Sequence, residues 1–370
     1  MLMDSTASLP AEAIALLQTA KSICPAEVAG AKQFLQLLYR SWHLGSNAND
    51  AELSSSVSTN GVLANSAPAN KVPANSLLTP SGYPLEFTFR SSKSELAYTA
   101  EPGLAQSKVI EKWAFAHELE SRADTQLNPL LAQLIAQPAQ HFGCWLGVCH
   151  KGAKQNFKIY QEVTSAMAEP VRNQLYASLM ANVSLTTNVR SGALFTPTLL
   201  GVLPADKDTT EYYGQVENPS FSVLHKLYRA SGKAAILPCV LNYLAELAAL
   251  PRDEVFTKLK IGLSFKITNS QVSCITLFCH ASQLFSSNFQ ARTRWLAMVG
   301  QLSGEAQLYL QLTASLQAES LLEHDCPQLV HGLVGLGAGD GNHIECSIGL
   351  RPFSPSPKEQ TAKAQGAKDV

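Results

Sequence analysis

The chain has 370 residues, 46% of them hydrophobic, and a formal net charge of −1. That length suits one large barrel or two domains, and that hydrophobic share is enough for a sizeable core. A chain so close to neutral has no field that would draw it to nucleic acid or to an anionic membrane, so we expect neither as a partner.

The sequence also favours a cytoplasmic protein. No uninterrupted apolar run reaches about 18 residues, so we expect no membrane insertion. The first residues, Met1 to Asp4, lack the basic and then apolar pattern of a signal peptide. The eight cysteines form no Cys-x-x-Cys pair, which is typical of buried, reduced thiols.

The first 80 residues divide into two parts of different composition. Apolar residues recur at helical spacing within 11–45, which predicts an N-terminal helical segment over 1–45 that packs on the rest of the protein. Residues 46–80 are rich in Ser, Asn, Ala and Pro. Because that composition cannot bury a core, we expect a low-complexity flexible loop there.

Between residues 81 and 353, five pairs of strand-like segments alternate with helical segments. The members of each pair alternate apolar and polar residues and are joined by a polar or glycine-containing turn, the pattern of a β-hairpin. The predicted hairpins cover 85–101, 141–163, 199–217, 258–280 and 332–350. Helical patterning lies near 105–137 and 169–183, follows the third hairpin to about 250, and recurs near 289–324. The tail 354–370 is predicted to be disordered.

Each predicted strand has an apolar face, and in most strands the other face is polar. In the first strand, Leu85, Phe87 and Phe89 lie on one side, whereas Glu86 and Arg90 lie on the other. A closed sheet with helices outside and a polar lumen explains this pattern. Because buried polar groups need partners, we expect the lumen to hold water or a ligand.

The first hairpin resembles that of a known enzyme family. Residues 84–87, Pro-Leu-Glu-Phe, and 98–102, Tyr-Thr-Ala-Glu-Pro, flank a Ser-Ser-Lys turn. In order and spacing they are similar to the first hairpin of aromatic (indole) prenyltransferases of the dimethylallyltryptophan synthase type. The five hairpins over about residues 80–353 are also similar to that family's fold. The resemblance implies an α+β protein with a PT barrel, a closed antiparallel ten-stranded β-barrel of αββα repeats ringed by helices.

The resemblance also implies an activity. Such an enzyme transfers a prenyl group from an allylic diphosphate to an indole, tryptophan-derived or phenolic acceptor, with no cofactor and no required metal, in secondary metabolism such as alkaloid biosynthesis. The chain has no Asp-Asp-x-x-Asp segment of the kind that clamps diphosphate through Mg²⁺. His141 and His150, at the ends of one predicted strand, are expected to be structural. The expected partners are the aromatic acceptor and the prenyl diphosphate, and we expect a monomer or homodimer.

The candidate site residues follow from the resemblance and from the polar strand faces. Glu86 is the candidate catalytic residue, which would accept a hydrogen bond from the acceptor N–H or O–H and raise the electron density of its ring. Lys158 and Tyr160 match the family's Lys-x-Tyr pattern, with the cation for the diphosphate and the ring as a shield for the allylic cation. The further substrate-binding candidates are Tyr213, Lys258, Lys260, Arg90 and Arg351.

The chain also departs from the family pattern, which leaves an alternative open. Ala97 stands where the family usually has an arginine for the diphosphate, and residues 210–215 lack the cations of the third repeat. The alternative is a diverged barrel that binds a hydrophobic small molecule, or catalyses a different reaction, without prenyl diphosphate. The number of inward-facing cations distinguishes the two, since fewer than three near one another would exclude the transferase.

Overall fold

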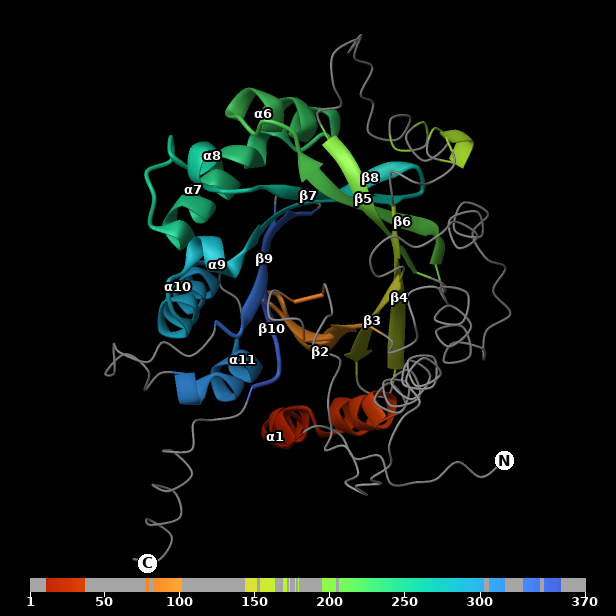
Figure 1. Cartoon of the computed structure of the whole chain (residues 1–370), viewed down its shortest axis with the longest axis vertical. Coiled ribbons are helices and arrows are strands. Elements are labelled where there is room, and N and C mark those ends of the chain that lie inside the picture. Colours follow the sequence, from red (N-terminus) through yellow and green to blue (C-terminus); the bar gives the residue numbers. More distant parts are fainter. Residues whose placement is uncertain are drawn as a thin grey trace, which may run out of the picture.

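The fold is a closed barrel of ten antiparallel strands with helices outside it (Figure 1). This arrangement confirms the predicted α+β PT barrel. In the computed structural model of the chain, the described residues are 11–36, 78–79, 83–101, 144–151, 154–163, 169–171, 173, 177, 179, 195–203, 206–302, 306–316, 329–339 and 343–353.

The strands pair with their neighbours in chain order, and β1 closes the ring against β10. They form five hairpins, as the alternating sequence pattern predicts. The strands are β1 (Leu85–Arg90), β2 (Lys93–Ala100), β3 (Cys144–Lys151), β4 (Lys154–Glu162), β5 (Phe195–Leu203), β6 (Asp206–Val216), β7 (Gly262–Thr268), β8 (Gln271–His280), β9 (His331–Ala338) and β10 (Ile344–Leu350).

Because every hairpin turns at the same end of the barrel, its two ends differ. We call that end the turn end, and the opposite end, where the chain passes between hairpins, the crossover end. The β7–β8 turn has positive φ at Asn269 and Ser270, 50° and 60°, as two-residue hairpins require. Glu86 lies near the crossover end, whereas Arg90 lies at the turn end of the same strand.

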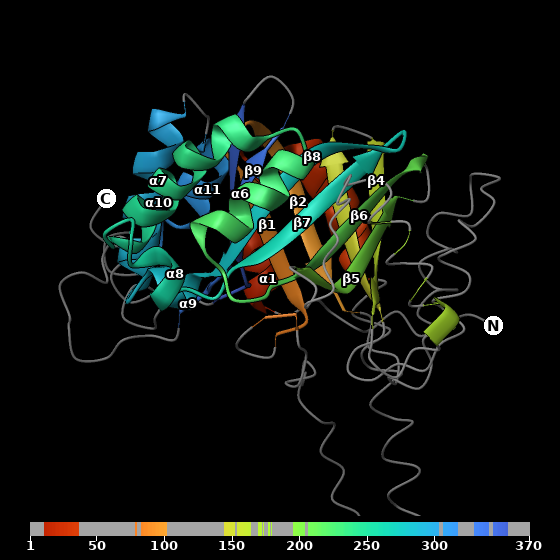
Figure 2. The ribbon, with the colours of Figure 1, turned by 90° about the horizontal axis from the view of Figure 1, so that it is seen from above.

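The helices lie around the outside of the barrel, as Figures 1 and 2 show. Ser220 and Ser287 begin α6 and α10, where each side chain accepts a hydrogen bond from the backbone N–H three residues ahead. Ala249, the C-terminal capping residue of α7, has the left-handed φ of 51°. The helices and the 3-10 turn are α1 (Ala11–Ala20), α6 (Phe221–Ala230), η3 (Ala234–Ile236), α7 (Leu237–Ala248), α8 (Val255–Lys258), α9 (Ala281–Leu284), α10 (Asn288–Gln301) and α11 (Gln307–Leu312).

The core lies between the barrel wall and the helices. The outward-facing side chains of the strands are apolar and almost completely buried, including Phe87, Ile159, Phe265 and Ile348. Burial of such side chains contributes roughly 1.5–3 kcal/mol each, so this layer supplies much of the free energy that holds the barrel closed. The prediction that the apolar face of each strand meets the helices is confirmed.

Two buried Tyr–His pairs support this outer layer. The Tyr98 hydroxyl lies 2.8 Å from His150 Nε2, and the Tyr309 hydroxyl lies 2.8 Å from His331 Nε2. Burial lowers the pKa of His150 to about 4 and that of His331 to about 3, so both rings are neutral at pH 7. His150 is therefore a structural residue, as expected, whereas His141 lies outside the described residues.

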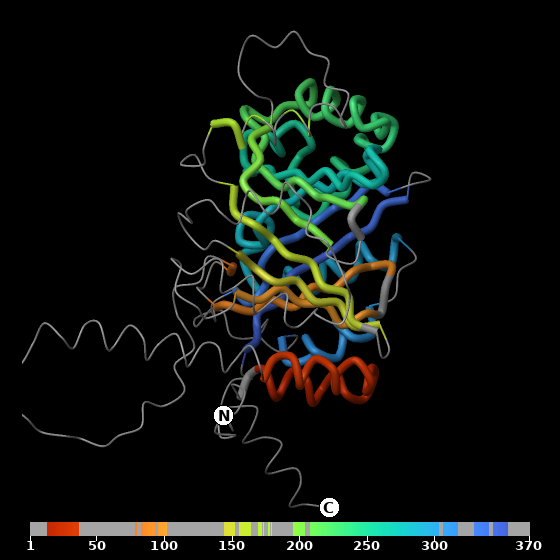
Figure 3. The backbone as a smooth tube through the Cα atoms, turned by 90° about the vertical axis from the view of Figure 1, so that its right-hand side faces the viewer, coloured from red at the N-terminus to blue at the C-terminus, as the bar shows by residue number. Residues whose placement is uncertain are grey.

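The N-terminal segment packs against the barrel in its described part. Figure 3 shows α1 and the helical residues 25–36 lying below the strands. Gly30 is so close to β3 and β4 that a Cβ there would lie 3.1 Å from His150 Nδ1 and 2.9 Å from Gln155 Nε2. The division into 1–45, 46–80, 81–353 and 354–370 stays a prediction, since 37–77 and 354–370 lie outside the described residues, as does the predicted helix 105–137.

The fourth hairpin corrects one prediction. Residues 258–261 continue the alternating pattern of β7, but the strand begins only at Gly262, and Lys258 is the last residue of helix α8. The N–H of Leu259 donates to the carbonyl of Val255 and closes this helical turn.

None of the described helices is long and apolar enough to span a membrane.

Candidate active site

The inner face of the barrel, opposite the helices, carries the polar side chains of the strands. Several of them are only half-buried, in contrast to the outward-facing layer. The pairing register places Tyr160 beside Gly201, Gly201 beside Glu211, and Glu211 beside Lys266 in one row across four strands. Residues from distant parts of the sequence are thus brought onto one accessible surface.

Glu86 on β1 is a buried acid of this face, with 7% of its surface exposed. Its carboxyl group lies against Gly332 and Gly349, where a Cβ at either position would overlap it. The backbone N–H of Leu333 donates to this carboxyl, but its Oε2 has no hydrogen-bond partner among the described residues. Burial raises the pKa of Glu86 to about 8, so the carboxyl is mostly protonated at pH 7.

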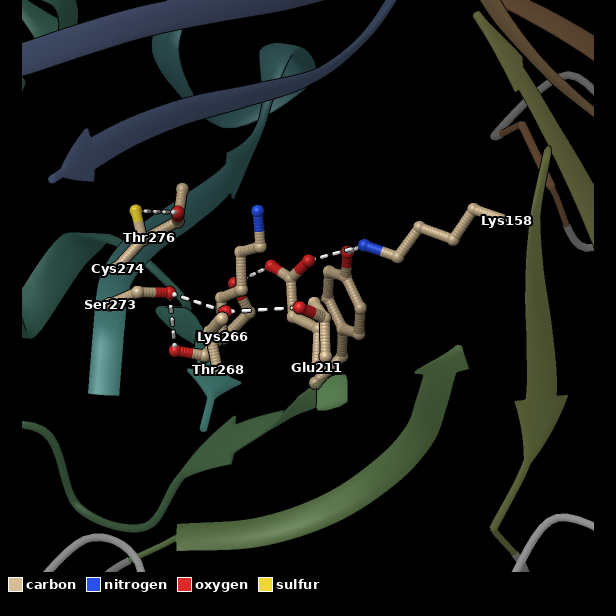
Figure 4. A network of polar contacts seen from close by, with 10 residues as sticks. Lys158, Glu211, Lys266, Thr268, Ser273, Cys274 and Thr276 are labelled. Atoms are coloured by element: carbon tan, nitrogen blue, oxygen red, sulfur yellow. Dashed lines mark hydrogen bonds and ion pairs between the residues drawn. The ribbon is translucent and has the colours of Figure 1, made fainter. Parts of the chain in front are cut away.

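Lys158 on β4 forms an ion pair with Glu211 on β6 (Figure 4). Lys158 also donates to the Tyr213 hydroxyl at 2.6 Å, and the second oxygen of Glu211 accepts from the Ser264 hydroxyl at 2.6 Å. Burial alone would raise the pKa of Glu211, but the ammonium and the hydrogen bonds hold that pKa below its usual value. Both members of the pair are therefore charged at pH 7.

Two tyrosine rings face the Lys158 ammonium. Its Nζ lies 5.1 Å from the ring centroid of Tyr160 and 5.0 Å from that of Tyr213, within the range of cation–π attraction. The rings meet edge to face, with centroids 5.6 Å apart. Gly201 gives the lysine room, since a Cβ there would lie 2.6 Å from its Cε. The arrangement stabilises positive charge between two aromatic faces.

Arg90 and Lys266 add two further cations to the inner face. Burial disfavours the charged form of Arg90, but Glu345 and Glu95 nearby raise its pKa above the usual value. Arg90 is also close enough to Lys158 to lower the pKa of that lysine, against the larger opposite effect of Glu211. Lys266 is the register neighbour of Glu211. Within the described residues, Lys158, Arg90 and Lys266 are thus candidate cations of the inner face.

The remaining candidate cations lie elsewhere. Lys258 in α8 and Lys260 before β7 are exposed near the crossover end, so the predicted lysine face of the fourth hairpin does not exist as such. Lys260 is near His280, whose pKa it lowers in addition to burial. Arg351 follows β10 at the crossover end. Burial lowers the pKa of Arg351 there, and the nearby Tyr83 partly opposes this shift. The structure does not place these three beside Lys158.

Three residues of this site were not predicted as site residues. They are Glu211, Ser264 and Gly201, none of which the sequence pattern marks as a site residue. The contacts of Glu211 with Lys158 and with Ser264 depend on the register of β4 to β7, which joins positions 53 residues apart in the chain. The sequence signal that could have found Glu211 is its spacing from Tyr213, because residues two apart on one strand share a face of the sheet.

Comparison with known proteins supports the fold, whereas the chemistry has to be argued from the residues of the site. A scan against protein-family models finds no match. A search of curated proteins by sequence finds none either.

The solved structures that resemble the chain include aromatic prenyltransferases. One is a 6-dimethylallyltryptophan synthase from Micromonospora olivasterospora in complex with DMASPP and Trp, at 13% identity and a TM-score of 0.66 over 92% of this chain and 96% of that one. Another is a 5-dimethylallyl tryptophan synthase from Streptomyces coelicolor, also with DMASPP and Trp, at 12% identity and 0.64 over 93% and 95%. A third is AnaPT from Neosartorya fischeri, at 13% identity and 0.61 over 92% of both chains. At such identities the likeness establishes the shared fold.

Proposed function

We propose that this protein is an aromatic prenyltransferase, which transfers a prenyl group from an allylic diphosphate to an indole, tryptophan-derived or phenolic acceptor without a required metal. The observation that carries the proposal is the Lys158 ammonium, held between Tyr160 and Tyr213 on the inner face of a PT barrel. The same face carries Glu86, whose Oε2 lacks a hydrogen-bond partner within the described residues. The two features provide for the donor and the acceptor respectively.

Glu86 would act on the acceptor. In its ionised form the carboxylate accepts a hydrogen bond from the indole N–H or phenol O–H and raises the electron density of the ring, which then attacks the allylic carbon. Gly332 and Gly349 leave space for this carboxyl, because a Cβ at either position would overlap it. Since burial raises its pKa to about 8, ionisation precedes or accompanies acceptor binding.

Lys158, Arg90 and Lys266 would bind the diphosphate. In the transfer, the C–O bond of the donor breaks and diphosphate leaves with the electron pair, while the aromatic ring forms the new bond to the allylic carbon and then loses a proton. The cations stabilise the charge that develops on the leaving diphosphate. The rings of Tyr160 and Tyr213 stabilise the allylic cation and keep water from it.

The test is direct product formation. Purified protein is incubated with dimethylallyl or geranyl diphosphate and with tryptophan, indole or a simple phenol, and products are identified by mass spectrometry. Prenylated acceptor that disappears in Lys158→Ala and Glu86→Gln supports the proposal. A correctly folded protein that gives no product with any pair, and that does not bind dimethylallyl or geranyl thiodiphosphate in a calorimetric titration, would refute it.

One observation favours the alternative of a diverged barrel that binds a hydrophobic small molecule. Glu211 neutralises Lys158, the candidate diphosphate cation. A lumen whose charges pair with one another suits a neutral ligand better than a polyanion. The thiodiphosphate titration separates the two proposals, since the diverged barrel binds neither donor analogue.

The wider setting is also proposed from the resemblance. We expect the enzyme to act in the cytoplasm, as a monomer or homodimer, in secondary metabolism such as alkaloid biosynthesis. The oligomeric state can be measured by light scattering during size-exclusion chromatography.

A further inference from the structure

We propose that Glu211 is an internal anion that occupies the donor's phosphate position in the ligand-free protein, and that diphosphate binding displaces it. This inference rests on the proposed function and adds to it a residue that sets donor affinity. In the ligand-free protein the Lys158–Glu211 ion pair occupies the donor site, and the donor diphosphate must break this pair in order to bind.

The contacts of Glu211 are those that a phosphate group uses. One carboxylate oxygen forms an ion pair with the Lys158 ammonium, and the other accepts a hydrogen bond from the Ser264 hydroxyl at 2.6 Å. The Tyr213 hydroxyl, 2.6 Å from Lys158 Nζ, lies beside them. An ammonium and two hydroxyl groups converging on two anionic oxygens form a small oxyanion site, and the protein fills it with its own side chain.

The position of the pair makes displacement feasible. The side chains of Lys158 and Glu211 keep 19% and 13% of their surface exposed, so a ligand on the inner face can reach both. The lysine crosses β5 above Gly201, where any larger residue would obstruct it. Glu211 is held only by non-covalent contacts and can rotate away from Lys158 once a phosphate takes its place.

The other cations of the inner face are also accompanied by acids. The charges of Glu345 and Glu95 raise the pKa of Arg90, and Glu211 is the register neighbour of Lys266. A donor diphosphate therefore competes with protein carboxylates, and Glu211 is the competitor in direct contact with Lys158. Removing its charge while keeping its shape should increase the affinity for diphosphate.

Displacement is also coupled to a proton. Lys158 and Ser264 hold the pKa of Glu211 low, so loss of these contacts beside an anion raises that pKa, and Glu211 takes up a proton. The titratable and charged groups that face this carboxyl are Lys158 and Tyr160 of β4, Tyr213 of β6, Lys266 of β7 and Cys274 of β8, with Arg90 of β1 acting on Lys158.

The experiment is a calorimetric titration with inorganic diphosphate at pH 7.5, in two buffers of different ionisation enthalpy. It compares the unmodified protein with Glu211→Gln and with Glu101→Gln, the matched control. Glu101 follows β2 at the crossover end, where it accepts a hydrogen bond from Trp145 Nε1 at 3.2 Å. Both variants remove one negative charge, but only Glu211 touches Lys158.

We expect Glu211→Gln to bind diphosphate about tenfold more tightly or better, because it frees a charged hydrogen bond. The proton uptake that accompanies binding should fall in the same variant. Glu101→Gln should change neither quantity appreciably, and adding Lys158→Ala to Glu211→Gln should abolish the gain.

Each contrary outcome has a distinct meaning. If the unmodified protein binds diphosphate and Glu211→Gln binds it no better, Glu211 is not a competitor, while the proposed function stands. An equal gain in Glu101→Gln also overturns the inference, because general charge then explains the effect. Absence of binding in every variant overturns both this inference and the proposed donor.

Discussion

Glu86 and Glu211 are two glutamates on one inner face with opposite electrostatic surroundings. Glu86 lies near the crossover end against two glycines, receives one backbone hydrogen bond, and has its pKa raised to about 8 by burial. Glu211 lies in the middle of the barrel, paired with Lys158 and Ser264, and its pKa is held below the usual value. At pH 7 the first is mostly neutral and the second is charged.

The difference shows how one barrel can provide two acids with separate tasks. Environments that push the pKa values of two carboxyl groups apart assign them different roles. The neutral Glu86 has an oxygen without a partner in the described part of the chain and is available to a ligand. Glu211 is already occupied by protein groups, so it acts on the ligand through Lys158. The predictions below test this division.

The largest expected effect is on Glu86 itself. Glu86→Gln keeps the shape of the side chain but removes the carboxylate, so kcat/KM for prenyl transfer should fall about 10²–10⁴-fold, the range of general-base contributions. Steady-state kinetics with the best acceptor measures the fall, and Glu101→Gln is the matched control. A loss below tenfold would mean that Glu86 does not activate the acceptor.

The raised pKa predicts the pH dependence. If the ionised carboxyl of Glu86 is the active form, kcat/KM rises with pH and levels off above about 8, and at pH 6 it is about a hundredfold below the plateau. The profile of kcat should level off at lower pH, because a bound N–H or O–H donor stabilises the carboxylate. A flat kcat/KM between pH 6 and 9 contradicts this assignment.

The glycines beside Glu86 provide a smaller effect. In Gly349→Ala the new methyl group overlaps the carboxyl group of Glu86, which must move. We expect about 1–3 kcal/mol of destabilisation from overpacking, together with a fall in kcat/KM. Chemical denaturation of Gly349→Ala in the Glu86→Ala background is the control. If the methyl group costs as much there, the clash is not with Glu86.

The fold was predictable from sequence because its signal is local. Strict alternation in 85–90 and 262–268 reports directly which side chains face the helices, and each hairpin carries its own turn residues. The same signal failed at Lys258, because the spacing of Val255 and Leu259 fits a helical turn while Leu259 and Ile261 also fit a strand. All three apolar residues are buried, so burial alone does not decide between a helical and an extended backbone.

The candidate site was predictable only in part. Parity placed Glu86, Lys158 and Tyr213 on the inner face, but the ion pair of Lys158 with Glu211 needs the register of β4, β5 and β6 together. That register includes irregularities in β5 at 197–199 and 202–203, which no local pattern indicates. Likewise, the glycines around Glu86 come from β9 and β10, far along the chain.

The last prediction turns Glu211 into a second unpaired acid. Lys158→Met removes its ammonium and leaves the carboxyl buried without its counter-ion, so its pKa should rise above the usual value, as that of Glu86 does. Breaking a fully buried pair costs roughly 3–5 kcal/mol, and for this partly exposed pair we expect about 2 kcal/mol at pH 7. Glu211 has a lowered pKa in the folded protein, so the stability it contributes is present above pH 4.5 and is lost as pH falls through its folded pKa.

The destabilisation by Lys158→Met should therefore shrink as pH falls through the lowered pKa of Glu211, because the carboxyl is then protonated in both proteins. Adding Glu211→Gln should restore most of the lost stability at pH 7, because the remaining amide carries no charge to desolvate. Denaturant unfolding of the two single variants and the double variant at pH 7 and pH 4 measures the coupling. If the double variant is as unstable as Lys158→Met, the cost comes from lost packing of the lysine stem over Gly201, and the charge state of Glu211 is not set by Lys158.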